Sequence, residues 1–174
     1  MAGSDIRAGS LTTSGFITKH RARLRALDVV GTSSAGLLYV FDTDTAPLAG
    51  TYVRSGTTVT VTDADHALQT GDMIGIAFAA GTGGSASAGN YEVTVVNSST
   101  FTITDINTGT ITNDPACSYV HSSDGKNAAW MATFRTAASD TFFNGFNVPD
   151  EGVLAKIGIY VQSSNLASIN IYYS

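Results

Sequence analysis

Asp63, Asp65 and His66 are the residues of this chain whose types and spacing come nearest to a reactive cluster. An acid beside a histidine can orient or charge the imidazole, as it does in hydrolases. A catalytic triad also needs a placed nucleophile, and the chain contains no nucleophile-elbow motif. Aspartates in such a turn commonly accept hydrogen bonds from nearby backbone N–H groups. We therefore expect a structural turn here, with His66 packed on it, and predict no catalytic residues and no enzyme activity.

Two pairs of aspartates have a spacing that a calcium loop could use, Asp42 with Asp44 and Asp63 with Asp65. A loop of the EF-hand type also needs a third oxygen ligand, a central glycine and a terminal glutamate at fixed positions. Neither stretch supplies them. We expect these aspartates to cap turns rather than to bind a metal ion.

The sequence pattern favours neither a zinc site nor a phosphate-binding loop. The histidines are scattered, and the single cysteine has no C-x-x-C partner; these residues are His20, His66, His121 and Cys117. The glycine-rich stretch 81–89 lies between expected strands and does not open a helix, as a phosphate loop does. One cysteine forms no intrachain disulfide, which fits folding in a reducing cytoplasm. We predict no metal and no cofactor.

Aromatic side chains invite a reading as a sugar-binding surface, because their faces stack on pyranose rings. Trp130, Tyr172 and Tyr173 are the candidates. They alternate with small apolar residues, which favours a core or a subunit interface. We assign Tyr172 and Tyr173 to an interface with other subunits or with a partner protein, and keep carbohydrate binding as an alternative.

Basic residues are concentrated near the start of the chain. Up to residue 25 there are five basic residues against one acidic residue, whereas the remainder has four basic and thirteen acidic residues, giving −5 overall. Within residues 16–30, alternate positions hold Lys19, Arg21, Arg23 and Arg25, and a period of two places them as one row on a single strand face. Arginine pairs well with carboxylates. We predict a surface that docks on an acidic partner protein or a neighbouring subunit; the alternative is a strand face that is only solvated. The net acidity makes nucleic acid an unlikely partner. The predicted partner-binding residues are Arg7, Lys19, Arg21, Arg23, Arg25, Tyr172 and Tyr173.

The elements that must carry these residues are short strands. Runs at 59–62, 91–95 and 101–104 alternate apolar with polar residues, and helical periodicity is absent over any useful length. We predict an all-β fold: an antiparallel, jelly-roll-like β-sandwich built from residues 1–50 and 116–174, with an inserted small β-barrel-like module at 51–115. The first 15 residues are expected to form an extended arm. Residues 157–161 and 168–173 are expected to close the chain as a hairpin.

Composition indicates assembly. Charged residues make up only 13% of the chain, about half the usual share. Together with an apolar C-terminal hairpin that leaves an edge to cover, this favours an oligomer, which we expect to be a homotrimer. The N-terminal residues lack a signal-peptide pattern, and no apolar run reaches membrane-spanning length. We expect synthesis in the cytoplasm and no membrane association.

Several stretches resemble structural proteins of tailed bacteriophages. The pattern TVTVT…DHALQTGD…GNYEVTVVNSSTFTIT is similar to a small β-module of phage virion proteins, in which GHGLSTGD precedes YTVTVVDANTFTV; Ala67 stands where that pattern has glycine. Residues 7–9, 21–30 and 148–173 resemble a second phage structural pattern. The resemblance implies a virion protein made in the host cytoplasm. It most concretely implies a capsid decoration or cement protein that binds the major capsid protein and stabilises the head shell. The alternative is a tail- or fibre-associated protein that contacts the host surface.

Overall fold

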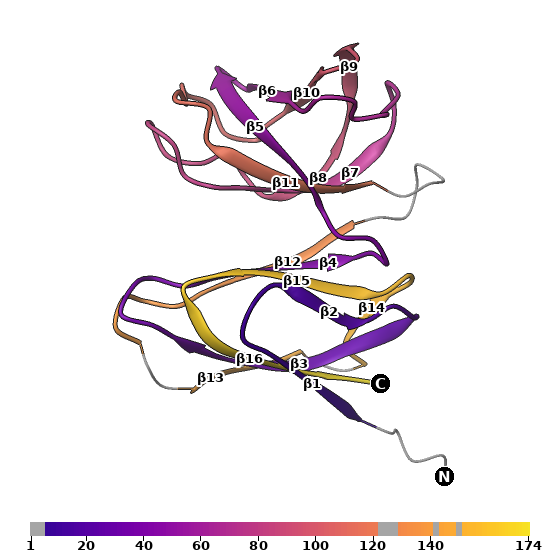
Figure 1. Cartoon of the computed structure of the whole chain (residues 1–174), viewed down its shortest axis with the longest axis vertical. Coiled ribbons are helices and arrows are strands. Elements are labelled where there is room, and N and C mark those ends of the chain that lie inside the picture. The colour runs from indigo at the N-terminus through magenta and orange to yellow at the C-terminus, as the bar shows by residue number, and fades with distance from the viewer. Residues whose placement is uncertain (1–5, 122–128, 141–142, 149–150) are drawn as a thin grey trace. The chain divides into compact units, whose positions relative to one another are not determined.

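The computed structural model describes residues 6–121, 129–140, 143–148 and 151–174. Within these ranges every regular element is a β-strand, and sixteen strands are defined. The chain divides into two compact units, one comprising Met1–Ala46 with Met131–Ser174 and the other comprising Pro47–Trp130. Figure 1 shows the strands of each unit. The predicted all-β, antiparallel fold class is confirmed.

The first unit is a sandwich of two sheets. One sheet follows the order β1-β16-β3-β13. In addition, β14 pairs with residues 22–24 of β3, whereas β13 pairs with residues 26–30 of the same strand. Its strands are β1 (Arg7–Leu11), β16 (Leu166–Tyr173), β3 (Ala22–Gly31), β13 (Phe143–Asn147) and β14 (Val153–Ala155). The other sheet follows the order β12-β4-β15-β2. Its strands are β12 (Ala129–Arg135), β4 (Leu37–Asp42), β15 (Ile159–Ser164) and β2 (Gly15–Thr18).

The strand orders of the two sheets match position by position. Read from one side, the first sheet runs β1, β16, β3, β13 and the second runs β2, β15, β4, β12. Each position therefore holds two strands that follow one another directly along the chain: β1 and β2, β15 and β16, β3 and β4, and β12 and β13. Eight strands that pass back and forth between two sheets in this way form a jelly roll. The predicted jelly-roll-like sandwich is confirmed, and the second unit lies in the β4–β12 connection.

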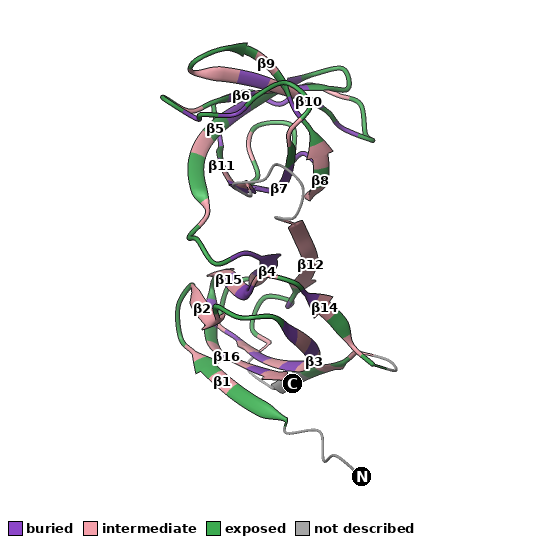
Figure 2. Cartoon of the chain, turned by 90° about the vertical axis from the view of Figure 1, so that its right-hand side faces the viewer, coloured by how far each residue is buried: buried purple, intermediate pink, exposed green. Residues whose placement is uncertain are grey.

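Alternation along β3 builds the core of the jelly roll. Leu24, Leu27 and Val29 are buried, and Figure 2 shows buried and intermediate segments alternating along this strand. Tyr172 pairs with Ala26 and Tyr173 with Leu24, which leaves one extra residue on β3 between these two pairs. This β-bulge shifts the inward side chains from even to odd positions. The alternation therefore keeps an apolar face toward the opposite sheet on both sides of the bulge.

The second unit is a single curled sheet with the order β8-β7-β11-β5-β6-β10-β9. Its strands are β5 (Leu48–Ser55), β6 (Thr58–Thr62), β7 (Met73–Phe78), β8 (Gly89–Glu92), β9 (Thr94–Asn97), β10 (Thr100–Thr104) and β11 (Ala116–His121). β8 and β9 are separated by Val93 alone, yet they occupy opposite ends of the sheet. The sheet must curl to bring its ends together, so the unit is barrel-like. We call this unit the module.

The module's sheet extends beyond the predicted range of 51–115. β5 begins at Leu48, and β11 pairs with β5 and β7 rather than with any strand of the jelly roll. Residues 116–121, which form β11, were predicted to belong to the sandwich. The pairing partners of β11 assign it to the module.

Two local expectations at the chain ends were wrong. The N-terminal segment is not simply an arm, because Arg7–Leu11 forms a full antiparallel ladder with β16. β15 and β16 do not form a hairpin, because they belong to different sheets and the chain crosses between the sheets at Asn165, whose φ is 55°. β16 pairs on both sides, with β1 and β3. The open C-terminal edge that favoured a trimer is therefore absent from β16, and the trimer stays a prediction.

Candidate functional site

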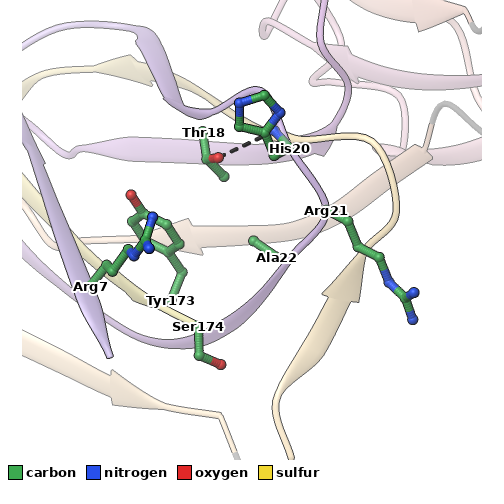
Figure 3. Close-up of a pocket in the computed structure, with 7 residues that line it drawn as sticks. All are labelled: Arg7, Thr18, His20, Arg21, Ala22, Tyr173 and Ser174. Atoms are coloured by element: carbon green, nitrogen blue, oxygen red, sulfur yellow. Dashed lines mark hydrogen bonds between the residues drawn. The ribbon is translucent and has the colours of Figure 1, made fainter. Parts of the chain in front are cut away.

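A pocket of about 450 Å³ opens at one end of the jelly roll. It is formed by β1, the end of β2, the β2–β3 connection and the end of β16, as Figure 3 shows. Its lining residues are Arg7, Thr18, His20, Arg21, Ala22, Tyr173 and Ser174. Three of them carry basic side chains and three carry hydroxyls, and no acidic side chain lines the pocket. We call this feature the basic pocket.

Strand register and one tight bend position these side chains. Arg7 and Tyr173 are paired across β1 and β16, so their side chains lie on the same face of the sheet. The backbone N–H of His20 donates to the Thr18 hydroxyl over 3.2 Å, which holds the bend between β2 and β3. Figure 3 shows Arg7 beside Tyr173, whereas the side chain of Arg21 extends from the connection away from the other labelled residues, at the rim of the pocket.

Arg7 and Arg21 are the uncommitted arginines of this group. Within the part of the chain that the structure describes, neither forms a side-chain hydrogen bond or an ion pair, and both are exposed. A guanidinium presents five N–H donors in a planar fork, which matches the oxygens of a carboxylate or phosphate. The basic pocket therefore keeps two anion-binding groups facing solvent.

The remaining basic residues of the predicted row have intramolecular partners. Arg23 lies 3.5 Å from Glu151, measured from Nη2 to Oε2, and Arg25 donates from Nε to the Ser174 hydroxyl over 2.9 Å. The Lys19 ammonium lies 4.3 Å from the centroid of the Phe16 ring. These contacts hold the side chains against the jelly roll itself.

The expectation of four basic residues on one continuous strand face was wrong. β2 ends at Thr18 and β3 begins at Ala22, so Lys19 and Arg21 lie in the connection between two different sheets. Alternation along the sequence continues through this bend, but the strand does not. The structure thus separates Arg21 from Arg23 and places it in the pocket with Arg7.

The aromatic candidates also separate. The hydroxyl of Tyr172 donates to Asp28 over 3.0 Å, and this hydrogen bond raises the pKa of Tyr172 above its usual value. Tyr173 lines the basic pocket. Trp130 lies at the boundary, because it is the last residue of the second unit and also the second residue of β12; its backbone N–H donates to the side chain of Asn90 over 2.8 Å. The three aromatic residues therefore do not gather within one unit as a stacking platform.

His66 has a structural role in the module. It is 4% exposed, its Nδ1 accepts the N–H of Leu68 over 3.0 Å, and its Nε2 lies 2.9 Å from the carbonyl oxygen of Asn97. These partners fit a neutral ring that carries its proton on Nε2. The ring also packs edge-on against Phe101, with centroids 5.3 Å apart. His66 thus ties its own turn to β9 and the core.

Two of the four aspartates weighed for catalysis and calcium, Asp42 and Asp63, form hydrogen bonds within the fold, whereas Asp44 and Asp65 are exposed. Asp63 was expected to bond a backbone N–H, but it accepts the hydroxyl of Tyr119 over 2.6 Å. Burial, followed by this contact with Asp63, raises the pKa of Tyr119. The buried carboxylate of Asp42 accepts three backbone N–H groups, from Lys156, Ile157 and Gly158, over 2.7 to 3.1 Å. No group of three or more potential metal ligands occurs among the described residues.

One buried ion pair was missed by the sequence analysis. Arg54 donates from Nη1 to Oδ2 of Asp105 over 2.6 Å, and the two side chains are 7% and 0% exposed. Burial by itself raises the pKa of Asp105, but hydrogen bonds from Asn107, Ser87 and Arg54 outweigh it, so the pKa is lowered. The available signal was that Arg54 shares the inward alternation of Tyr52 in β5. The pair stabilises the loop after β10 and leaves no charge accessible to a ligand.

A second, smaller hollow of about 290 Å³ lies on the module. It is lined by Tyr91, Glu92, Thr94 and Thr104. The hydroxyl of Tyr91 donates to the carbonyl of Ser87 over 2.7 Å, which orients the ring. The hollow combines an aromatic ring with hydroxyls and one carboxylate.

Similarity to known proteins is found at the level of structure. No known family matches it, and no curated protein matches it. Among solved structures, it is similar to the phage phi92 endosialidase, with a TM-score of 0.31 and 20% identity over 82% of this chain and 20% of that one. The chain thus spans about a fifth of that protein, and this degree of likeness carries no argument about activity. Within the described residues, no helix has the length and apolar character needed to cross a membrane. Fold and pocket together define the class: an all-β jelly-roll protein with an inserted barrel-like module and a basic pocket.

Proposed function

We propose that this chain is a non-enzymatic structural protein of a bacteriophage virion, and most specifically a decoration or cement protein on the head shell. The observation that carries the proposal is the jelly-roll order of the outer segments, with a barrel-like module in the β4–β12 connection. Jelly rolls are the architecture of many viral capsid proteins, and also of lectins. This is a fold-level analogy, and the phage-like sequence patterns support it independently.

The basic pocket supplies the proposed means of attachment. Arg7 and Arg21 are free of intramolecular ion pairs among the described residues and lie on one end of the jelly roll. Charge-assisted pairs between arginine and carboxylate are among the stronger polar contacts across an interface. We propose that this end faces the major capsid protein. A homotrimer remains our proposal for the assembled form, supported by the low content of charged residues.

Quantitative composition of purified virions tests the proposal. A head decoration protein is expected in many copies, in a fixed ratio to the major capsid protein, with density on the outside of the shell in a reconstruction of the particle. Particles made without the gene should lose that density and break at a lower temperature. Absence of the protein from purified virions would refute the proposal.

The hollow on the module favours a second candidate, a tail- or fibre-associated protein that contacts the host surface. Its ring, hydroxyls and carboxylate, from Tyr91, Thr94, Thr104 and Glu92, are the groups that a sugar site uses. This candidate predicts a handful of copies per particle located at the tail. The same composition measurement therefore separates the two.

A further inference from the structure

We propose that the basic pocket binds an acidic protein segment, with carboxylates of that segment paired to Arg7 and Arg21. The ligand class follows from the pocket itself. Only the identity of the partner, a virion protein, rests on the proposed function.

The pocket has the shape and chemistry for such a segment. Its volume of about 450 Å³ lies within the range of sites that enclose a ligand. Arg7 and Arg21 extend from different elements and lie on different sides of the pocket in Figure 3, so they suit two carboxylates better than one. Thr18 and Tyr173 add hydroxyl groups to the pocket lining.

The distribution of partners among the basic residues argues against nucleic acid. A phosphate backbone is held by a row of cations, each of which neutralises one phosphate. Here Arg23 faces Glu151, Arg25 donates to Ser174, and Lys19 lies over Phe16. Two uncommitted arginines around one pocket suit a short acidic segment better than a long polyanion.

The charge of the rest of the chain points the same way. Residues 47–130 hold two basic and seven acidic residues, whereas the remaining segments hold seven of each. The module alone carries a net charge of −5, so its own surface does not favour a polyanion such as nucleic acid.

Titration of the full chain, observed through its amide NMR signals, tests the proposal. The probe is a short blocked peptide of alternating glutamate and glycine, compared with the same peptide carrying glutamine and with a single-stranded thymidine oligonucleotide. We expect the glutamate peptide to shift the amide signals of Thr18, His20 and Ala22, and the glutamine peptide to shift none of them. Stronger binding of the oligonucleotide than of the peptide would overturn the proposal in favour of nucleic acid.

Matched variants locate the interaction. Arg7→Gln and Arg21→Gln should each lower the affinity for the glutamate peptide about tenfold, the effect of losing one charge-assisted contact. Arg135→Gln removes the same charge from an exposed position at the end of β12, outside the pocket, and should leave affinity unchanged. Equal affinities in all three variants would refute the pocket, as would no binding by the wild type at low salt.

A melting curve accompanies each variant. Arg21 is exposed and lies outside the strands, so Arg21→Gln should fold normally even if a substitution in β1 does not. Arg7→Lys provides a further comparison, because it keeps the charge but loses the planar fork. We expect affinity between those of wild type and Arg7→Gln. Wild-type affinity in both Arg7 variants would refute a role for this arginine.

Discussion

Removing Arg54 should destabilise the module severely, because its partner is a fully buried carboxylate. In Arg54→Met the side chain keeps most of its apolar stem, but Asp105 loses its only cationic partner among the described residues. Asp105 would keep neutral donors, including the N–H groups of Ser87 and Asn107 at 3.2 Å each. Breaking one side of a buried ion pair typically costs about 3–5 kcal/mol. That is a large share of the roughly 5–15 kcal/mol that stabilises a typical domain.

The chain contains a reporter for the module alone. Cys117 is the single cysteine of the sequence, and it lies 3% exposed in the module core. Labelling of its thiol during urea titration therefore follows the opening of the module and not of the jelly roll. With a urea dependence of about 1–3 kcal/mol per molar, the expected loss lowers the midpoint by at least about 1 M.

A second substitution separates the charge effect from packing. Combining Arg54→Met with Asp105→Leu removes both charges, and replacing a whole buried pair by apolar residues is often nearly neutral. We expect the double variant to be more stable than Arg54→Met. Arg135→Met, which removes an exposed arginine assigned to the jelly roll, should leave the midpoint of thiol labelling unchanged. A loss below about 1 kcal/mol in Arg54→Met, or a double variant less stable than it, would refute this account of the pair.

Four further predictions concern the module and its insertion. The pKa of Asp105 is lowered in the folded protein. The carboxylate therefore contributes its full stabilisation above the unfolded pKa of about 4, and this contribution is lost as the pH falls through the folded pKa. The pH dependence of thiol labelling should show this loss in the wild type and not in Asp105→Asn. Burial raises the pKa of Cys117 to about 12, so a maleimide should fail to label the native protein at pH 8 and should react at once in urea; rapid native labelling would contradict the buried position. Ala67 has a φ of 55°, a backbone conformation that costs alanine about 1–2 kcal/mol and glycine almost nothing. Ala67→Gly should therefore stabilise the module by about 0.5–1 kcal/mol in the urea titration. Ala64→Gly, at a position without positive φ, should not stabilise it. Deleting residues 47–128, which spares all of β12, and joining the ends with a short Gly/Ser link should leave a jelly roll with cooperative melting, because β4 and β12 are hydrogen-bonded neighbours; a variant without a cooperative transition would show that the jelly roll needs the module.

Local alternation predicted the strands of the module well. The runs 59–62 and 101–104 became β6 and β10, and Val59, Val61, Phe101 and Ile103 are all buried as a period of two requires. The run 91–95 was predicted as one strand, but it divides at Val93, which is itself fully buried between β8 and β9. Side-chain alternation is a local property, whereas the division reflects the sheet closing on itself at that residue.

Local alternation could not predict which strands pair, or which charges meet, across long sequence separations. Arg7–Leu11 looks like a small, polar arm until Ile169–Tyr173 is placed beside it. The same limit applies to Arg54, whose partner lies 51 residues away. A strand pattern states which side chains face inward, and it does not state which strand or charge meets them.

The sequence by itself determined the all-β class, the division into outer segments and an inserted module, and the concentration of basic residues near the N-terminus. These follow from the period of two, from glycine-rich turns and from the order of charges along the chain. Only the tertiary structure decided which basic residues remain available. Arg23 and Arg25 meet Glu151 and Ser174, residues from the far end of the chain, whereas Arg7 and Arg21 meet no such partner among the described residues. Availability of a charge depends on neighbours that folding brings together, which is why Arg21 is separated from the rest of its row and lines a pocket with Arg7, an arginine from another strand.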